Sequence, residues 1–359
     1  MLSPRDTVRN LPTYHPPLGG RAGLRLDFNE NTVGCSPRVL ERLRRIGFEE
    51  LARYPERQPV EEIAAAYLQV SPKELLLTNG VDEAIHLICE TYLEPGNEVC
   101  LVVPTFSMYE IFAAATGARV VSVPAAGNFD FPIESLKRQV TSSTRLIVVA
   151  NPNNPTGAAA PVEDLLSLAD SAPSAALLVD EAYFEFHRET LASRWQGRPN
   201  VFVARTFSKA FGLAGLRVGV LMGNSEQMNS VRRVTSPYNV NSVALACLPE
   251  ALADSDYVRG YVEEVCAGRE RLQAELKDLG IPHWPSRANF VLMRLGSFNS
   301  PFIHGMRQRG ILVRDRSRDY GCEGCARITL GSTEHTDRLL VALRETLQEV
   351  GALQQETRS

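Results

Sequence analysis

The sequence lacks any apolar run long enough to cross a membrane, because no uninterrupted hydrophobic stretch approaches the ~20 residues that a spanning helix needs. Its first residues, MLSPRDTVRNLPTYHPPLGGR, also lack the apolar core of a secretory signal. Neither sign of charge is in marked excess, since the formal net charge of the 359 residues is -4. We therefore expect no membrane partner and no electrostatic attraction to nucleic acid.

Cysteine is too scattered to form a disulfide framework. The seven cysteines are an odd number spread over a long chain, a pattern that favours reduced thiols and a cytoplasmic protein. Cys322 and Cys325 form a CxxC pair, but no second pair and no histidine cluster accompany it, so we interpret it as incidental. The six histidines show no paired ligand spacing, and no metal site is expected.

The central part of the chain alternates short β-branched runs with helical stretches. ELLLTNG precedes VDEAIHLICETYL, EVCLVVP precedes SMYEIFAAATGA, and TRLIVVA precedes VEDLLSLADSA. Strands that are apolar throughout and separated by helices are typical of an α/β fold with a mostly parallel sheet covered on both faces. In such sheets ligands bind beyond the carboxyl ends of the strands.

The pattern changes after Tyr238. A long, charged helical stretch is expected over Val243–Leu279, followed by the strand-like segments ANFVLMRL, GILVRD and CARITLG and by a closing helix with Ser332 as its N-cap. We predict an N-terminal arm over residues 1–28 and a large domain over 29–240, whose start contributes in part to the small domain. Residues 241–359 are expected to form that small α+β domain.

Polar side chains follow three of the predicted strands at the points where the strands end. Asn154 lies in NPNNPTG, Asp180 in VDEAY and Lys209 in TFSKAF, separated by 26 and 29 residues. A βα unit of about 30 residues places each of them on a neighbouring or nearby strand end, so we expect the three to converge. A lysine that forms a Schiff base, facing a carboxylate that pairs with a pyridinium nitrogen, is what pyridoxal phosphate requires.

The same region offers groups that suit a phosphate. Gly80, in TNGVDEAI, lies at a strand-to-helix turn with free backbone N–H groups. Thr206, Ser208 and Arg217 bring two hydroxyls and a guanidinium close to Lys209 in the chain.

These motifs resemble those of the fold-type I pyridoxal-phosphate aminotransferases, specifically the histidinol-phosphate aminotransferases. The similarity runs along almost the whole chain, in the order LDFNEN, RYPE, TNGVDEAI, VPTFSMY, NPNNPTG, DEAYFEF, RTFSKAFGLAGLRVG, GILVRD and ARITLG. NPNNPTG followed by DEAY and SKAFGLAGLRVG at these spacings is specific for the superfamily. The resemblance implies a large domain with a mostly parallel seven-stranded sheet between helices, a smaller α+β domain, and pyridoxal 5'-phosphate as the cofactor.

The resemblance also implies roles for individual residues. Lys209 would be the Schiff-base lysine and proton shuttle, Asp180 the partner of the pyridinium nitrogen, and Asn154 and Tyr183 the partners of the pyridine O3′. The cofactor phosphate and ring would be held by Gly80, Val81, Asp82, Thr206, Ser208, Arg217 and Tyr109, the last of which would stack on the ring. Tyr54 would reach the phosphate of the neighbouring subunit, which makes a homodimer necessary for a complete site.

Four further residues match groups that bind the substrate in this family. Arg327 matches the arginine that holds the α-carboxylate, Arg314 and Tyr14 match groups that hold the substrate phosphate, and Asn29 matches a residue near the amino-acid end. The implied activity is amino transfer between L-histidinol phosphate and 2-oxoglutarate, which gives imidazole acetol phosphate and L-glutamate in histidine biosynthesis.

Three alternatives stay open at this point. An aromatic amino acid aminotransferase and a threonine-phosphate decarboxylase of cobalamin synthesis would use the same lysine and cofactor. A non-catalytic aminotransferase-like module of a transcription regulator is disfavoured, because only a short arm precedes the core and because Lys209 and Asp180 are both present.

Overall fold

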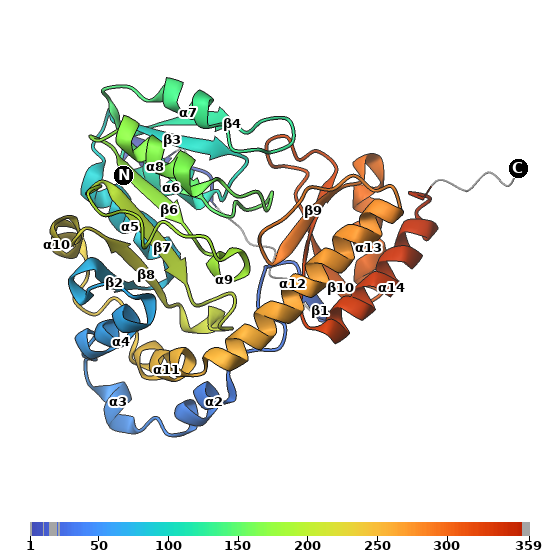
Figure 1. The fold of residues 1–359 in the computed structure, drawn as a ribbon, viewed down its shortest axis with the longest axis horizontal. Coiled ribbons are helices and arrows are strands. Elements are labelled where there is room, and N and C mark those ends of the chain that lie inside the picture. The colour runs from blue at the N-terminus through green and yellow to red at the C-terminus, as the bar shows by residue number, and fades with distance from the viewer. Residues whose placement is uncertain (1, 10, 14–19, 21, 354–359) are drawn as a thin grey trace, which may run out of the picture.

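The structure is a computed structural model that describes residues 2–9, 11–13, 20 and 22–353. Two lobes are evident in Figure 1, a larger one around a seven-stranded sheet and a smaller one around a four-stranded sheet. The long helix α12 (Ser255–Asp278) begins beside the larger lobe and ends on the smaller one. No helix in the described part of the chain combines the length and hydrophobicity needed to cross a bilayer.

The sheet of the larger lobe is mostly parallel, which confirms the predicted α/β class. Its strand order is β2-β8-β7-β6-β5-β3-β4, and β8 alone runs antiparallel to its neighbours. The strands are β2 (Leu75–Thr78), β3 (Glu98–Val103), β4 (Arg119–Pro124), β5 (Thr144–Ala150), β6 (Ala176–Asp180), β7 (Val201–Thr206) and β8 (Gly219–Gly223).

Helices cover both faces of this sheet because successive strand residues point to opposite sides. In β6, Leu177 and Val179 belong to one hydrophobic cluster, whereas Leu178 belongs to the cluster on the opposite face. The first cluster includes residues of α4 (Gln58–Leu68) and α8 (Val162–Ser171), and the second those of α5 (Gly80–Tyr92), α6 (Met108–Ala115) and α10 (Ser225–Val234). Runs that are apolar throughout therefore mark strands buried on both sides.

Strand β4 is not among the strands predicted from the apolar runs of the sequence. It lies at the edge of the sheet, and Val123 is its one buried residue. An edge strand exposed in this way carries little of the continuous apolar signal that marks the central strands.

The expected helix over Val243–Leu279 is divided into α11 (Ser242–Ala253) and α12 by Asp254, whose φ and ψ are -106° and 56°. The Asp254 carboxylate accepts a hydrogen bond from Ser36, far away in the sequence. Helix α11 packs on α2 (Pro37–Arg44), α3 (Phe48–Ala52) and α4, whereas α12 packs on β9 (Phe290–Arg294) and α14 (Thr333–Glu349). The division of the chain at residue 240 stays a prediction.

The smaller sheet has the order β1-β10-β11-β9, and β1 (Leu24–Leu26) pairs in parallel with β10. The end of the predicted arm is thus part of this sheet. The N-cap predicted at Ser332 is confirmed, since its side chain accepts a hydrogen bond from the backbone N of His335. The other elements of this lobe are β10 (Ile311–Asp315), β11 (Cys325–Thr329), η3 (Gly296–Phe298) and α13 (Asn299–Gln308).

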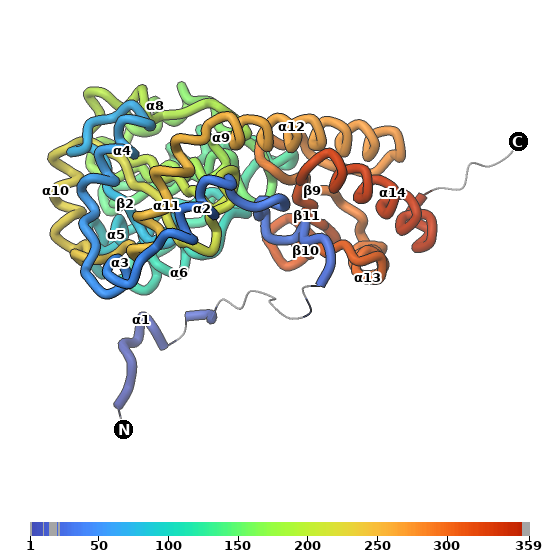
Figure 2. Tube along the Cα trace, turned by 90° about the horizontal axis from the view of Figure 1, so that it is seen from below, coloured from blue at the N-terminus to red at the C-terminus, as the bar shows by residue number. Residues whose placement is uncertain are grey.

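The described part of the N-terminal arm also contacts the larger lobe. Helix α1 (Asp6–Arg9) lies near α6, as Figure 2 shows, and Arg5 Nη2 donates to Ala115 O at 3.1 Å. The remaining elements of the larger lobe are η1 (Pro72–Glu74), α7 (Ile133–Gln139), α9 (Phe184–His187) and η2 (Ala214–Leu216).

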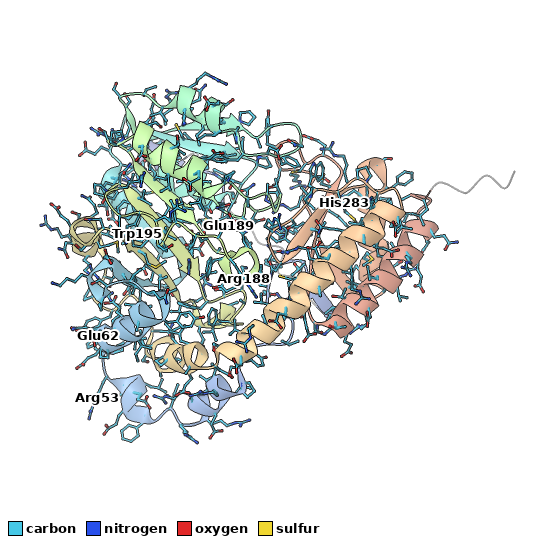
Figure 3. All side chains as sticks on the ribbon, viewed as in Figure 1. Arg53, Glu62, Arg188, Glu189, Trp195 and His283 are labelled. Atoms are coloured by element: carbon cyan, nitrogen blue, oxygen red, sulfur yellow. The ribbon has the colours of Figure 1, made fainter. Side chains whose placement is uncertain are left out.

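Contacts between the two lobes include one of α9 with α12. In Figure 3, Arg188 and Glu189 follow α9 on the side of the larger lobe that faces the smaller one, and His283 lies on the smaller lobe. A second contact follows β5, where Arg287 N donates to Gly157 O at 2.8 Å. Gly157 has φ +76°, and a Cβ at this position would overlap the Ser286 side chain.

We expect Gly157→Ala to lower the free energy of unfolding by roughly 2–4 kcal/mol, because it adds left-handed backbone strain and an overlap. Urea unfolding measures this difference. The control is Gly260→Ala in α12, where a Cβ meets nothing within 4 Å. The free energy of unfolding of this control should rise by up to about 1 kcal/mol. Equal effects of the two substitutions would contradict the account of the Gly157 contact.

Candidate active site

The carboxyl ends of β5, β6 and β7 bring three chemically active side chains together. Ala150 of β5 is paired with Asp180 of β6, and Asp180 with Ala204 of β7, so the three strands end close to one another. Asn154 and Lys209 lie a few residues beyond the ends of β5 and β7 and line, with Asp180, one cavity of about 310 Å³. The convergence expected from the spacing is therefore present in the structure.

Lys209 is held partly out of solvent at this edge. Its Nζ donates a hydrogen bond to Phe28 O at 3.2 Å. Burial, followed by the nearby charge of Arg327, lowers the pKa of Lys209 from 10.5 to about 8. At pH 7 about a tenth of this amine is then uncharged, and the uncharged amine is the form that can act as a nucleophile or as a base.

Asp180 is 5% exposed and has two partners at the end of β6. Its Oδ2 accepts from Tyr109 Oη at 2.6 Å, and its Oδ1 accepts from Ala182 N at 2.9 Å. Burial raises the pKa of Asp180 to about 6, so that the carboxyl group is mainly ionised at neutral pH. Burial also raises the pKa of Tyr109 well above its usual value, so Tyr109 remains a phenol that can donate.

Tyr183 lies beside these groups and is held by the smaller lobe. Asn29 Nδ2 donates to Tyr183 Oη at 2.8 Å. Asn29 itself has φ +56°, and its Oδ1 accepts from Thr329 Oγ1 at 3.0 Å. Asn289 Nδ2 donates to Asn29 O at 3.1 Å, which further fixes this unusual backbone.

Arg327, on β11, reaches the same groups from the smaller lobe. Its Nη1 donates to Asn154 Oδ1 at 2.5 Å and its Nη2 to Asp27 O at 2.8 Å. Burial, followed by the charges of Arg316 and Arg314, lowers the pKa of Arg327 to about 9, and it stays charged at neutral pH. A second cavity, of about 570 Å³, adjoins the first, and both are lined by Asn154, Tyr183 and Lys209.

A candidate anion site lies at the start of α5. Gly80 has φ +75°, and a Cβ on it would lie 2.6 Å from Arg217 Nη2. Ser208 Oγ is buried without a hydrogen-bond partner among the described residues, and Ser208 N donates to Thr206 Oγ1 at 3.1 Å. A helix N-terminus, a guanidinium and a free hydroxyl are a donor set suited to a phosphate group.

The donors and charges of the first cavity fit pyridoxal phosphate. It offers an amine for the aldehyde, a carboxylate for the ring nitrogen, and this donor set for the phosphate. Within the described residues no cluster of three or more His, Cys, Asp or Glu side chains has a geometry that would hold a metal ion.

Comparison with known proteins agrees with this geometry. The family model for aminotransferase class I and II matches residues 21–343. The chain belongs to this family.

Individual aminotransferases are similar over most of their length. The chain is 38% identical to a histidinol-phosphate aminotransferase of Caldanaerobacter subterraneus subsp. tengcongensis, with 82% of this chain and 83% of the relative covered. It is also 38% identical to one from Roseiflexus castenholzii, with 95% and 97% covered. The crystal structure of the Sinorhizobium meliloti histidinol-phosphate aminotransferase in complex with pyridoxal-5'-phosphate has a TM-score of 0.87, at 26% identity, and covers 96% of this chain and 98% of its own. These comparisons confirm the family predicted from the sequence.

Most of the side chains predicted for the aminotransferase site lie at these two cavities. The first is lined by Val81, Asp82, Tyr109, Asn154, Asp180, Tyr183, Thr206, Ser208, Lys209 and Arg217, and the second by Asn29, Arg314 and Arg327. Asp82 Oδ2 accepts from Arg217 Nη2 at 3.1 Å. The functional roles of all these residues stay predictions.

Of the predicted site residues that the structure describes, Gly80 and Tyr54 line neither cavity, and Gly80 lies at the start of α5 beside Arg217. Tyr54 is 77% exposed and stacks on Tyr238, with ring centroids 4.2 Å apart. Tyr14 lies outside the described residues.

The sequence reasoning missed several side chains of the aminotransferase's second cavity. Arg316 and Asp319 line it and form an ion pair with each other. Their only signal in the sequence is the charged run RDRSRD, which usually marks a solvated surface. Thr329 and Asn289, which hold Asn29, gave no signal, because their partner is hundreds of residues away in the chain.

Asp180→Asn should stabilise the cofactor-free protein at neutral pH. Because burial raises the pKa of Asp180 from 3.8 to about 6, wild-type stability falls as the pH rises through this interval. The free energy of unfolding of the variant should therefore exceed that of wild type by up to about 3 kcal/mol above pH 6, and this difference should vanish near pH 4. Urea unfolding from pH 4 to 8 measures this.

The control is Asp170→Asn on the surface, where Arg198 lowers the pKa of the carboxyl group. Loss of that ion pair should reduce stability slightly above pH 4, which is the opposite sign. A gain for Asp180→Asn that is the same at every pH would contradict the account.

Proposed function

We propose that the protein is a histidinol-phosphate aminotransferase. It uses pyridoxal 5'-phosphate to transfer an amino group between L-histidinol phosphate and 2-oxoglutarate, a step of histidine biosynthesis. The observation that carries the proposal is the meeting of Lys209 and Asp180 with the charged Arg327 at adjoining cavities, in a chain 38% identical to aminotransferases of this name.

The first cavity would hold the cofactor through contacts at three of its groups. Lys209 would hold its aldehyde end, Asp180 would keep a proton on its ring nitrogen, and Asn154 and Tyr183 would hydrogen-bond its O3′. The phosphate would be held by the start of α5 at Gly80, Val81 and Asp82 and by Thr206, Ser208 and Arg217. When bound, pyridoxal phosphate draws electron density away from the α-carbon of an amine substrate, which acidifies the α-proton.

Lys209 then acts as the base that removes and returns this α-proton. Its lowered pKa makes the neutral amine available near neutral pH. Tyr109 holds the Asp180 carboxylate in place through the 2.6 Å hydrogen bond. Its ring would stack on the bound cofactor. The contact of Asn29 with Tyr183 fixes the phenol from the smaller lobe.

The second cavity would bind the anionic end of the substrate. Arg314 of β10 lies directly opposite Arg327 of β11 in the antiparallel register, and like charges in this position repel. An anion between the two guanidiniums relieves that repulsion, so we assign the substrate phosphate to both arginines and the α-carboxylate of glutamate to Arg327. Asn29 and Tyr14 complete this end of the site.

Substrate comparison tests the proposed function. Wild type should convert histidinol phosphate with a higher kcat/KM than phenylalanine. Arg314→Ala should lower kcat/KM for histidinol phosphate by roughly 10- to 1,000-fold, the loss expected for a charge-assisted contact, and that for phenylalanine by less than about 3-fold. Coupled glutamate release measures both rates.

Lys209→Ala provides the control for this assay, because it should fold but show no turnover of either substrate. A preference for phenylalanine would instead identify an aromatic aminotransferase. Release of carbon dioxide from threonine phosphate would identify a decarboxylase.

The complete site would require a homodimer. Large apolar side chains are exposed on α2, α3 and α4 and in the loops after α3 and α10, namely Leu40, Phe48, Leu51, Tyr54, Tyr67 and Tyr238. Figure 3 places Arg53, the chain neighbour of Tyr54, at the margin of the larger lobe. A second copy would cover these side chains, and its own Tyr54 would reach the phosphate bound by the first copy.

All seven cysteines are free, which supports a cytoplasmic location for this dimer.

Shared sites predict complementation between two impaired variants. Tyr54→Ala and Lys209→Ala chains, co-expressed with different tags, should form heterodimers in which one of the two sites has both residues. Random pairing should then restore activity to about a quarter of wild type, well above either variant alone. Tandem-affinity purification isolates the heterodimer, whose activity should reach about half of wild type because one of its two sites is complete. Activity no higher than the mean of the two parents would rule out a shared site.

A further inference from the structure

We propose that Arg316, paired with Asp319, is a third anion-binding arginine of the second cavity and selects substrates that carry two negative charges. This inference rests on the proposed function for the identity of the substrates, and it adds a specificity-determining residue that the motifs do not include. The ligand class is a small dianion, either a phosphate monoester or a dicarboxylate.

Arg316 lies on the same face of the extended chain as Arg314, which is already assigned to the substrate. It follows β10 directly, and its backbone N donates to Cys325 O at 2.9 Å, which extends the pairing with β11. Because side chains alternate along extended chain, Arg314 and Arg316 project to the same side. Both line the cavity of about 570 Å³, together with Arg327.

Hydrogen bonds from Asn299 hold the turn that carries Arg316. Asn299 is 3% exposed, and its Nδ2 donates to Asp315 Oδ1 at 3.0 Å, to Ser317 Oγ at 2.9 Å and to Cys325 O at 3.2 Å. The side chains on both sides of Arg316 are therefore held before any ligand binds, and Ser317 N donates to Asp315 Oδ1 at 2.9 Å across the turn. A guanidinium placed in this way loses little conformational freedom on binding an anion.

Arg316 is also largely buried, unlike an ordinary surface arginine. Its side chain is 14% exposed, and that of its partner Asp319 is 28% exposed. Its Nε is buried without a hydrogen-bond partner among the described residues. A donor is thus left over after the ion pair has formed, and leaving it without a partner is unfavourable in a buried position.

The charge around Arg316 favours an anionic ligand. Five arginines and one lysine line this cavity, against three aspartates. Arg316 and Arg314 also act on Arg327, whose pKa their charges lower further after burial has lowered it. A ligand with one carboxylate balances only part of this positive charge, whereas a phosphate monoester or a dicarboxylate brings a second negative charge.

Asp319 sets the strength of this selection. It neutralises Arg316 in the free protein, so an incoming dianion competes with its carboxylate for the guanidinium. Removing the Arg316 charge should weaken dianions selectively. Removing the Asp319 charge should leave dianion binding intact or strengthen it.

Binding of unreactive acids tests the inference without turnover. Calorimetry on the cofactor-loaded protein would compare glutarate with pentanoate, in which a methyl group replaces one carboxylate. We expect Arg316→Gln to weaken glutarate binding about ten-fold, which is the effect of one charge-assisted hydrogen bond. Binding of pentanoate should weaken less than about two-fold. Asp319→Asn should bind glutarate at least as tightly as wild type.

Arg271→Gln is the matched control, since it removes the same charge from an arginine of α12 that is also paired with an aspartate, Asp337, but lines neither cavity. It should change glutarate binding by less than about two-fold. Arg316→Lys keeps the charge and should retain most of the preference for glutarate, and it carries the test if Arg316→Gln fails to fold.

Three results would overturn the inference: no preference of wild type for glutarate, equal losses of both acids in Arg316→Gln, or an Asp319→Asn variant as weak as Arg316→Gln, which would indicate a structural ion pair. Failure of the proposed function looks different. Wild type could fail to convert histidinol phosphate while Arg316→Gln still weakens glutarate binding selectively. That result would support the dianion site and contradict the substrate assignment.

Discussion

Parallel pairing of β5, β6 and β7 is the constraint on which the site depends. Because the three strands run in the same direction, their carboxyl ends lie at one edge, and Asn154, Asp180 and Lys209 arrive there from distant parts of the chain. The alternating clusters on the two faces of the sheet hold this edge in place. A shift of one strand by one residue would turn its apolar side chains to the wrong face and move its polar end away from the cavity.

Burial at that edge also supplies the chemistry. It lowers the pKa of Lys209 and raises that of Asp180, and each shift destabilises the charged form in the absence of ligand. Tyr109 offsets part of this cost at Asp180. The smaller lobe closes the arrangement with Asn29 on Tyr183 and Arg327 on Asn154, so the site depends on the contact between the lobes as well as on the sheet.

How much was visible in the sequence follows from the range of the interactions. The central strands, Asp180 and Lys209 were predictable, because continuous apolar runs mark buried strands and a regular βα spacing brings their ends together. Strand β4 escaped because an exposed edge carries a weak apolar signal. The break at Asp254 depends on Ser36, and the place of Arg316 depends on Asn299 and on pairing with β11. Such tertiary contacts leave no local pattern in the sequence.

The most direct test of the central claim is a stoichiometric titration of the cofactor-loaded protein with histidinol phosphate, without an oxo acid. The absorbance of the bound cofactor reports transfer of the amino group. The account predicts that one equivalent per chain converts the cofactor to its amine form and releases imidazole acetol phosphate, and that Lys209→Ala shows no such conversion. A cofactor spectrum that histidinol phosphate leaves unchanged, while phenylalanine converts it, would contradict the account.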